Sequence, residues 1–199
     1  MAPPPLGGLG SLMSDDALVR YYRTMARNNA WSNHRLLAAC AALSQNEFEA
    51  PRVGFFPSLA STLNHILFVD RYYLDALARR PRAFDEESPC ATVEALRAAQ
   101  SASDRRLIAL CDALDGPGLA RPVRLIRDHA SVLEERTDRV LAHLFMHQIH
   151  HRGQAHAMLA GTRVAPPQLD EFLLATDSAL RSGDLGALEF SEDEIWLAG

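Results

Sequence analysis

The stretch VLAHLFMHQIHHRGQAHAM, residues 140–158, decides the fold because one series of positions runs through it at helical spacing. Positions at alternating steps of four and three form this series: Val140, Leu144, His147, His151, Gln154 and Met158. Such residues lie along one face of an α-helix, the face that packs against partner helices. We therefore expect a helix over residues 137–160, ended by Gly161 in the left-handed conformation that is common after helices.

The two histidines of the series, His147 and His151, are four residues apart, which places their Cβ atoms about 6 Å apart on one face. Two helical histidines hold zinc at this spacing in HExxH motifs. Each residue taken alone is more often a packed core histidine than a ligand. The pairs His143 with His147 and His147 with His150 have permissible spacing too, so the motif by itself leaves the ligand pair open.

Three further amphipathic segments precede this helix. Apolar residues recur at helical steps in three ranges: 14–43, 58–79 and 92–113. Thr92 is a good N-cap for the third segment, and Pro81 closes the second. Four long amphipathic helices without a convincing strand pair predict an all-α fold, a helical bundle.

The remaining segments are predicted from composition. Residues 119–136, LARPVRLIRDHASVLEER, carry Pro122 and β-branched residues without a clear period, so we interpret them as an irregular crossover. A short helix is expected over residues 168–180, followed by an acidic tail. Residues 1–13 lack the features of a signal peptide and are expected to form a disordered leader. Residues 14–199 then form a single domain.

Charge and cysteine usage exclude several classes of function. The net charge of −5 leaves no basic excess for a phosphate backbone, which disfavours dedicated nucleic-acid binding. Three distant cysteines, Cys40, Cys90 and Cys111, fit neither a disulfide framework nor a CxxC metal site, which indicates a reducing compartment such as the cytoplasm. No apolar run approaches the roughly 20 residues that span a bilayer, so we expect no membrane insertion.

A metal site on the fourth helix needs a third ligand from another helix. His65 is the best candidate, because it lies in the middle of the second predicted helix between core positions. His34 lies off the apolar stripe of the first helix and is expected to be solvated. His129 falls in the expected crossover, and His156 is one step off the series that contains His147.

Three blocks of the sequence carry a resemblance to a known family. They are MARNNAWSNHRLL (25–37), LNHILFVDRYYLDAL (63–77) and HLFMHQIHHRGQAHAML (143–159). They look like the DinB family, the DinB/YfiT-like metalloenzymes, over roughly residues 14–175. The last block is the most specific, with a histidine, three residues, and a histidine followed by Arg-Gly-Gln. The resemblance implies an up-down-down-up four-helix bundle, here with a short additional C-terminal helix, and frequent homodimers.

Carried over by position, the resemblance implies that His65, His147 and His151 bind a divalent metal, with zinc or nickel expected first. His143 is left with a supporting or an exposed role. Members that resemble this chain include thiol-dependent S-transferases and an isomerase. The implied function is a metal-dependent enzyme that activates a low-molecular-weight thiol towards a small electrophile. The alternative is a non-catalytic, stress-associated helical protein whose metal only joins two helices.

Polar residues near the motifs are weaker candidates for the site. Asn29 interrupts the apolar stripe of the first helix, where its side chain either forms a hydrogen bond in the pocket or bonds to a neighbouring backbone group. Arg152 steers an anionic cosubstrate or extends to solvent, and Gln154 orients a ligand or forms a hydrogen bond across the bundle. Asp70 either accepts from an imidazole N–H or forms a surface ion pair with a neighbouring arginine. Cys40 lies on the stripe of the first helix and is expected to be a core residue.

Overall fold

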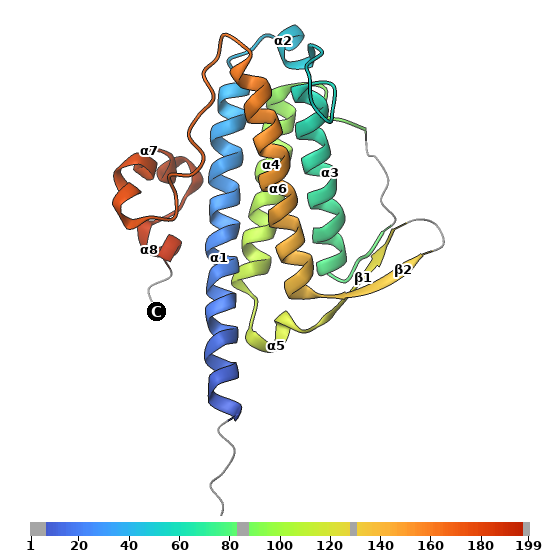
Figure 1. The fold of residues 1–199 in the computed structure, drawn as a ribbon, viewed down its shortest axis with the longest axis vertical. Helices are drawn as coiled ribbons and strands as arrows, with labels where there is room; N and C mark the ends of the chain where they lie inside the picture. The colour runs from blue at the N-terminus through green and yellow to red at the C-terminus, as the bar shows by residue number, and fades with distance from the viewer. Residues whose placement is uncertain (1–6, 83–87, 128–130, 197–199) are drawn as a thin grey trace, which may run out of the picture.

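Four long helices lie side by side in the computed structural model, which describes residues 7–82, 88–127 and 131–196 (Figure 1). They are α1 (Gly7–Cys40), α3 (Leu59–Leu77), α4 (Val93–Asp112) and α6 (Thr137–Ala160). In Figure 1, α1 and α6 run from the lower end to the upper end, and α3 and α4 run the opposite way. The fold is therefore mostly helical, as the sequence predicts.

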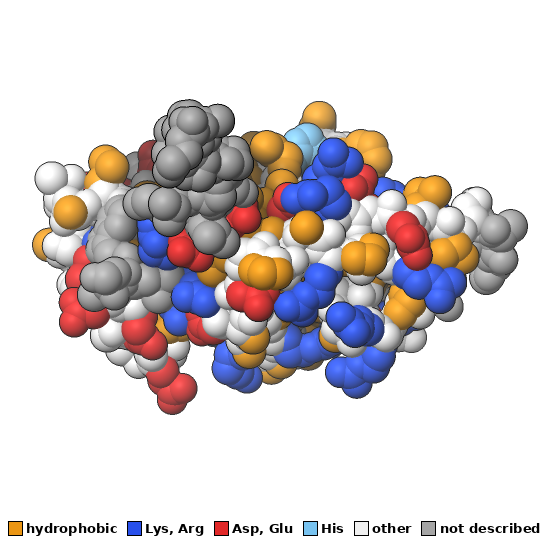
Figure 2. All heavy atoms as spheres, turned by 90° about the horizontal axis from the view of Figure 1, so that it is seen from below, with side chains coloured by type: hydrophobic (Ala, Val, Ile, Leu, Met, Phe, Trp, Pro, Cys, Tyr) orange, Lys and Arg blue, Asp and Glu red, His pale blue; other side chains and the backbone are white. Residues whose placement is uncertain are grey.

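Shorter elements connect and flank the long helices. They are α2 (Gln45–Glu49), α5 (Gly116–Leu119), β1 (Pro122–Ile126), β2 (Val132–Arg136), the 3₁₀ turn η1 (Ala175–Asp177), α7 (Ser178–Leu188) and α8 (Glu192–Trp196). Both α7 and α8 lie beside α1, on the side away from α3 (Figure 1). None of the described helices combines the length and the apolar character needed to cross a membrane. The lower end of the molecule carries both signs of charge, with apolar side chains between them (Figure 2).

Side-chain caps fix the starts of two long helices where the sequence predicts them. The Ser58 side chain accepts a hydrogen bond from the backbone N–H of Ser61, and Thr92 caps Ala95 in the same way. The bounds predicted for α6 are also confirmed. The left-handed conformation predicted for Gly161 is wrong, because its φ is −83°. The carbonyl of Met158 accepts instead from the backbone N–H of Gly161, and that of Leu159 accepts from the backbone N–H and the hydroxyl of Thr162.

The first helix begins earlier than residue 14, where the first amphipathic segment was predicted to start. Residues 7–13, which we expected in the leader, belong to α1, and residues 1–6 lie outside the described residues. Once a helix has formed, each further residue adds one backbone hydrogen bond at little cost, so it can extend beyond a good cap.

The irregular crossover expected before α6 is a β-hairpin, so that prediction is wrong. β1 and β2 pair antiparallel, with Pro122 opposite Arg136. Buried and exposed side chains alternate along β1, as expected for a strand with one face on the core: Val123 and Leu125 are buried and Arg124 is exposed. β2 is mostly exposed and shows no such alternation, so the sequence pattern that identifies a strand is present in only one of the two strands. Residues 128–130, including His129, lie outside the described residues.

The C-terminal helix predicted over residues 168–180 is displaced towards the C-terminus. The structure has only the turn η1 and then α7 from Ser178 to Leu188. Gly183 and Gly186 lie inside α7 although glycine disfavours helices. Packing outweighs that preference, because Arg181 and Leu185 of α7 are both buried.

A buried polar layer separates two of the three apolar clusters of the described core. One cluster includes Tyr22, Leu107 and Leu144, and the other includes Leu63 and Leu159. The polar layer lies between them in all four long helices and consists of Asn29, Asn33, Asp70, Gln100, Asp104, Gln148 and Arg152. Such groups are costly to bury unless they bond to one another, so their pairing must be specific.

Candidate metal centre

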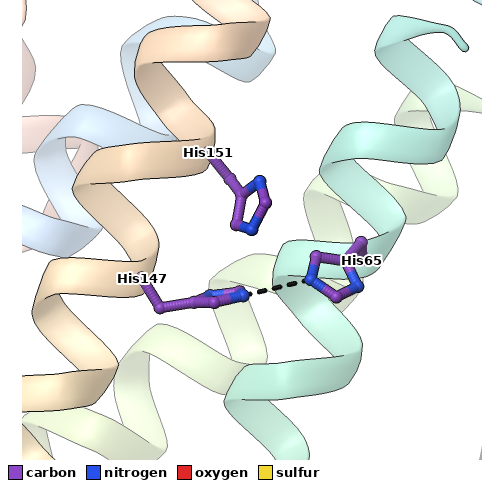
Figure 3. Close-up of side chains that lie close together, drawn as sticks. All are labelled: His65, His147 and His151. Carbon is purple, nitrogen blue, oxygen red and sulfur yellow. Dashed lines mark hydrogen bonds between the residues drawn. The ribbon is translucent and has the colours of Figure 1, made fainter. Parts of the chain in front are cut away.

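Three histidine side chains from two helices point toward one another (Figure 3). His65 comes from α3, and His147 and His151 come from successive turns of α6. The Nε2 atoms of His65 and His147 are 3.1 Å apart. One ligand atom from each of the three residues lies within 4.8 Å of the other two. The cluster could therefore hold a metal ion.

The surroundings keep these imidazoles neutral at pH 7. Burial lowers the pKa of His65 to about 4 and that of His147 to about 3, and the nearby His151 adds to both shifts. Burial also lowers the pKa of His151. A neutral imidazole has a free nitrogen lone pair, which is what a metal ligand needs.

Gln154 fixes the orientation of one imidazole. Its Oε1 atom lies 2.8 Å from Nδ1 of His151. Because a carboxamide oxygen can only accept, Nδ1 carries the proton, and the lone pair is on Nε2. The Gln154 amide nitrogen lies 3.0 Å from Nε2 of His150, so this carboxamide contacts both histidines. Of the weaker candidates Asn29, Arg152 and Gln154, the structure brings only the Gln154 side chain into contact with the cluster.

Two adjacent aromatic residues cover one side of the histidines. The ring centroid of Phe56 lies 4.4 Å from that of His65 and 5.6 Å from that of His151. Phe55 is 77% exposed, with its centroid 6.3 Å from that of His151. Sequence reasoning treated these residues only as loop. Their position in a short loop, immediately before the helix that carries His65, is the signal that could have identified them.

The other histidines of the fourth helix lie outside the cluster. His143 and His150 are exposed, and the ring of His143 contacts Tyr73. His156 bonds to the backbone oxygen of Pro167. Among the described histidines of α6, only His147 and His151 have ligand atoms close to that of His65.

A comparison with family models matches residues 13–181 to the model described as DinB family. The chain belongs to the DinB family. The match spans all three histidines and the four sequence-predicted long helices, and it confirms the family suggested by the three sequence blocks. A comparison with curated proteins gave no match.

In this DinB-family chain, the remaining candidates Asn29 and Arg152 lie in the buried polar layer. Arg152 is 4% exposed and donates to the side-chain oxygens of Asn29, Asn33 and Gln148. The expectation that it extends to solvent is wrong, because α1 supplies acceptors inside the core. Arg152 follows His151 directly, so the same turn of α6 carries a histidine of the cluster and a residue of the layer.

Asp70 is also buried, and the expected surface ion pair is wrong. It is 2% exposed, and its Oδ2 atom accepts from Gln100 at 2.8 Å and from Gln148. Asp104 accepts from Asn29 and Gln100, each at 3.1 Å. These donors come from three helices, and their convergence is what makes the burial of two carboxyl groups possible.

The polar layer holds one guanidinium between two carboxyl groups. Burial, with repulsion from Asp104, raises the pKa of Asp70 to about 7. Burial likewise raises the pKa of Asp104 to about 6. Burial lowers the pKa of Arg152 to about 10, which leaves it charged at pH 7. One positive charge can balance only one carboxylate, so a large fraction of the Asp70 carboxyl groups stays protonated near neutral pH.

Proposed function

We propose that His65, His147 and His151 bind one divalent metal ion, zinc or nickel, and that the chain is a metal-dependent enzyme. The observation that carries this proposal is the approach of three neutral imidazoles within 4.8 Å from two helices. Imidazole nitrogen suits zinc and nickel, and three protein ligands are typical of catalytic zinc. Membership of the DinB family supports the same assignment.

The proposed centre keeps a position for a substrate. His65 and His147 are partly exposed, and three protein ligands leave at least one coordination site open. When bound, such a metal lowers the pKa of a coordinated water or thiol and supplies a nucleophile at neutral pH. The chain's own residues orient and shield the site, since Gln154 sets the proton of His151 and Phe56 excludes water from one side.

We propose that the nucleophile is a low-molecular-weight thiol, in S-transferase-like chemistry. Cys40 and Cys111 are fully buried, and burial raises the pKa of each thiol to about 12. Neither can attack at neutral pH. Cys90 is partly exposed but supplies no ligand atom to the histidine cluster. We therefore propose that the sulfur activated at the metal comes from a cosubstrate.

Three further features complete the proposal: the helix arrangement, the oligomeric state and the cellular location. We propose that the four long helices form the up-down-down-up bundle of the family, in agreement with their directions in Figure 1. We propose a homodimer, because Met146 and Ile149 expose apolar side chains on α6. The three free cysteines support a cytoplasmic location.

Elemental analysis of protein purified without a histidine tag tests the ligand assignment. We expect close to one metal ion per chain, and its loss in each of His65→Ala, His147→Ala and His151→Ala. His143→Ala is the matched control, because His143 lies on the same helix outside the cluster, and it should retain the metal. Metal that persists in all three cluster variants refutes the assignment.

Cobalt substitution separates the enzyme from its alternative, a non-catalytic protein with a structural metal. A Co²⁺ ion with an open position should bind 2-mercaptoethanol and give a thiolate charge-transfer band in the near ultraviolet. A spectrum that does not respond to the thiol would favour the structural metal, because a closed site has no position for a further ligand.

A further inference from the structure

A cleft of about 680 Å³ lies beside the histidine cluster. It is bounded by the loop before α3, by one face of α3 and by residues 89–91. Its volume is in the range of small-molecule binding sites. The residues that matter for its chemistry are Phe56, Asn64, His65, Phe68, Pro89 and Cys90.

Two residues belong both to the cleft and to the surroundings of the cluster. His65 lines the cleft and directs Nε2 towards His147 (Figure 3). Phe56 lines the cleft, and its ring packs against His65. A molecule held in the cleft therefore touches the same imidazole that faces the proposed metal position.

The wall of the cleft favours uncharged ligands. Phe56, Phe68 and Pro89 give it an apolar surface, and Glu49 is the one Asp, Glu, Lys or Arg among the described lining residues. The chain carries 20 basic residues, and none of them lines the described part of the cleft. Apart from the proposed metal, the described wall offers an anion no cationic partner to replace its hydration, whereas an apolar body gains from burial.

Hydrogen bonds hold the wall of the cleft in place. The Asn64 side chain accepts from the backbone N–H of Cys90 at 2.8 Å and donates to the backbone oxygen of Cys90 at 3.3 Å. This pair ties residues 89–91 to α3 without any ligand. A wall that is already ordered binds a ligand at a lower entropic cost.

We infer that this cleft binds the electrophilic substrate, a small uncharged molecule with an aromatic or aliphatic body. The inference rests on the proposed function, because it places the electrophile next to the thiol-activating centre. It also separates the two substrates, with the thiol at the metal and the apolar body between α3 and residues 89–91.

Cys90 provides a reporter for this cleft. Cys40 and Cys111 are fully buried, so iodoacetamide should alkylate Cys90 first in the folded protein. The rate is followed by mass spectrometry with benzamide or benzoate, which share a shape and differ in charge. We expect benzamide to slow the alkylation about threefold at twice its dissociation constant, and benzoate to have no effect. Equal protection by benzoate, or none by benzamide, overturns the inference.

A variant in which a larger side chain fills the cleft, compared with the same substitution at a surface position, tests the location of the binding site. Ala60 lines the cleft near the start of α3. In Ala60→Trp the larger side chain should fill the cleft, so benzamide should no longer change the alkylation rate of Cys90, whatever that rate is without benzamide. Ala102→Trp, on an exposed position of α4, should keep that dependence. Protection that persists in Ala60→Trp overturns the inference. Zinc stoichiometry, measured on the same samples, reports separately on the proposed function, since the alkylation assay works on metal-free protein.

Discussion

Gln154 shows how much of the candidate site depends on one hydrogen bond. Its Oε1 atom holds the proton of His151 on Nδ1 and so directs Nε2 to the cluster. Sequence spacing indicated His147 and His151 as one of several possible pairs, and the resemblance to the DinB family then implied these two together with His65. It could not predict the burial of Asp70 and Arg152, because that depends on partners in α1 and α4, up to 123 residues away.

Replacing Gln154 by leucine should weaken metal binding while leaving all three histidines in place. Without the acceptor on Nδ1, His151 is free to adopt the wrong tautomer or rotate away, and such losses typically lower metal affinity about 10-fold to 100-fold. Competition with a zinc-binding dye measures the effect. Gln168→Leu, at an exposed position, is the control and should bind zinc as the wild type does. Equal affinities for both variants would contradict this role.

Among the elements, α6 is the helix on which the site and the core depend together. His147 and His151 lie on its flank, and Gln148 and Arg152 follow them directly on its buried side. The bounds of α6 were predictable because its periodic series is long. The hairpin was not predicted, because buried and exposed residues alternate only in β1. The C-terminal helix was predicted too early in the chain, because the two glycines of α7 disfavour a helix that packing stabilises.

The polar layer should make stability depend on pH. Because the folded pKa of Asp70 is raised to about 7 from 3.8, the folded protein keeps a proton that the unfolded chain loses. This contribution to the free energy of unfolding falls as pH rises from about 4 to 7, by about 1 kcal/mol per pH unit. Asp70→Asn should remove that slope relative to the wild type, as measured by urea unfolding at pH 5, 6 and 7.

The surface variant Asp75→Asn is the control for this measurement. Asp75 lies on the same helix and pairs with Arg106 and Arg82 at the surface. It should keep the pH dependence of the wild type, because Asp75 lies outside the buried polar layer. If Asp70→Asn and Asp75→Asn give parallel curves, the retained proton does not reside on Asp70.

At the scale of the whole molecule, the C-terminal segment closes the outer side of α1. Trp31 is fully buried against Phe172, Leu185 and Ile195, and its indole N–H donates to Asp184 at 3.1 Å. Arg35 lies over the same indole ring, 4.2 Å from its centroid. The family match ends at residue 181, so part of this cover lies beyond the matched region.

Removing residues 168–199 should expose Trp31 and destabilise the protein. The chain has two tryptophans, so the truncated protein reports on Trp31 alone, and full-length Trp196→Phe is its matched reference. We expect a red-shifted emission, stronger quenching by acrylamide, and a loss of at least about 2 kcal/mol in the free energy of unfolding. Zinc stoichiometry should persist, because the histidines lie on α3 and α6. An unchanged emission maximum would contradict this account.

The contact between Trp31 and Asp184 joins positions 153 residues apart, and this sets an order of events during translation. At the usual rate of elongation, a ribosome needs roughly 8 to 30 s to cover that distance. For this interval the nascent chain carries an uncovered indole on its first helix. We expect chaperones to bind there, and their release to follow the emergence of α7.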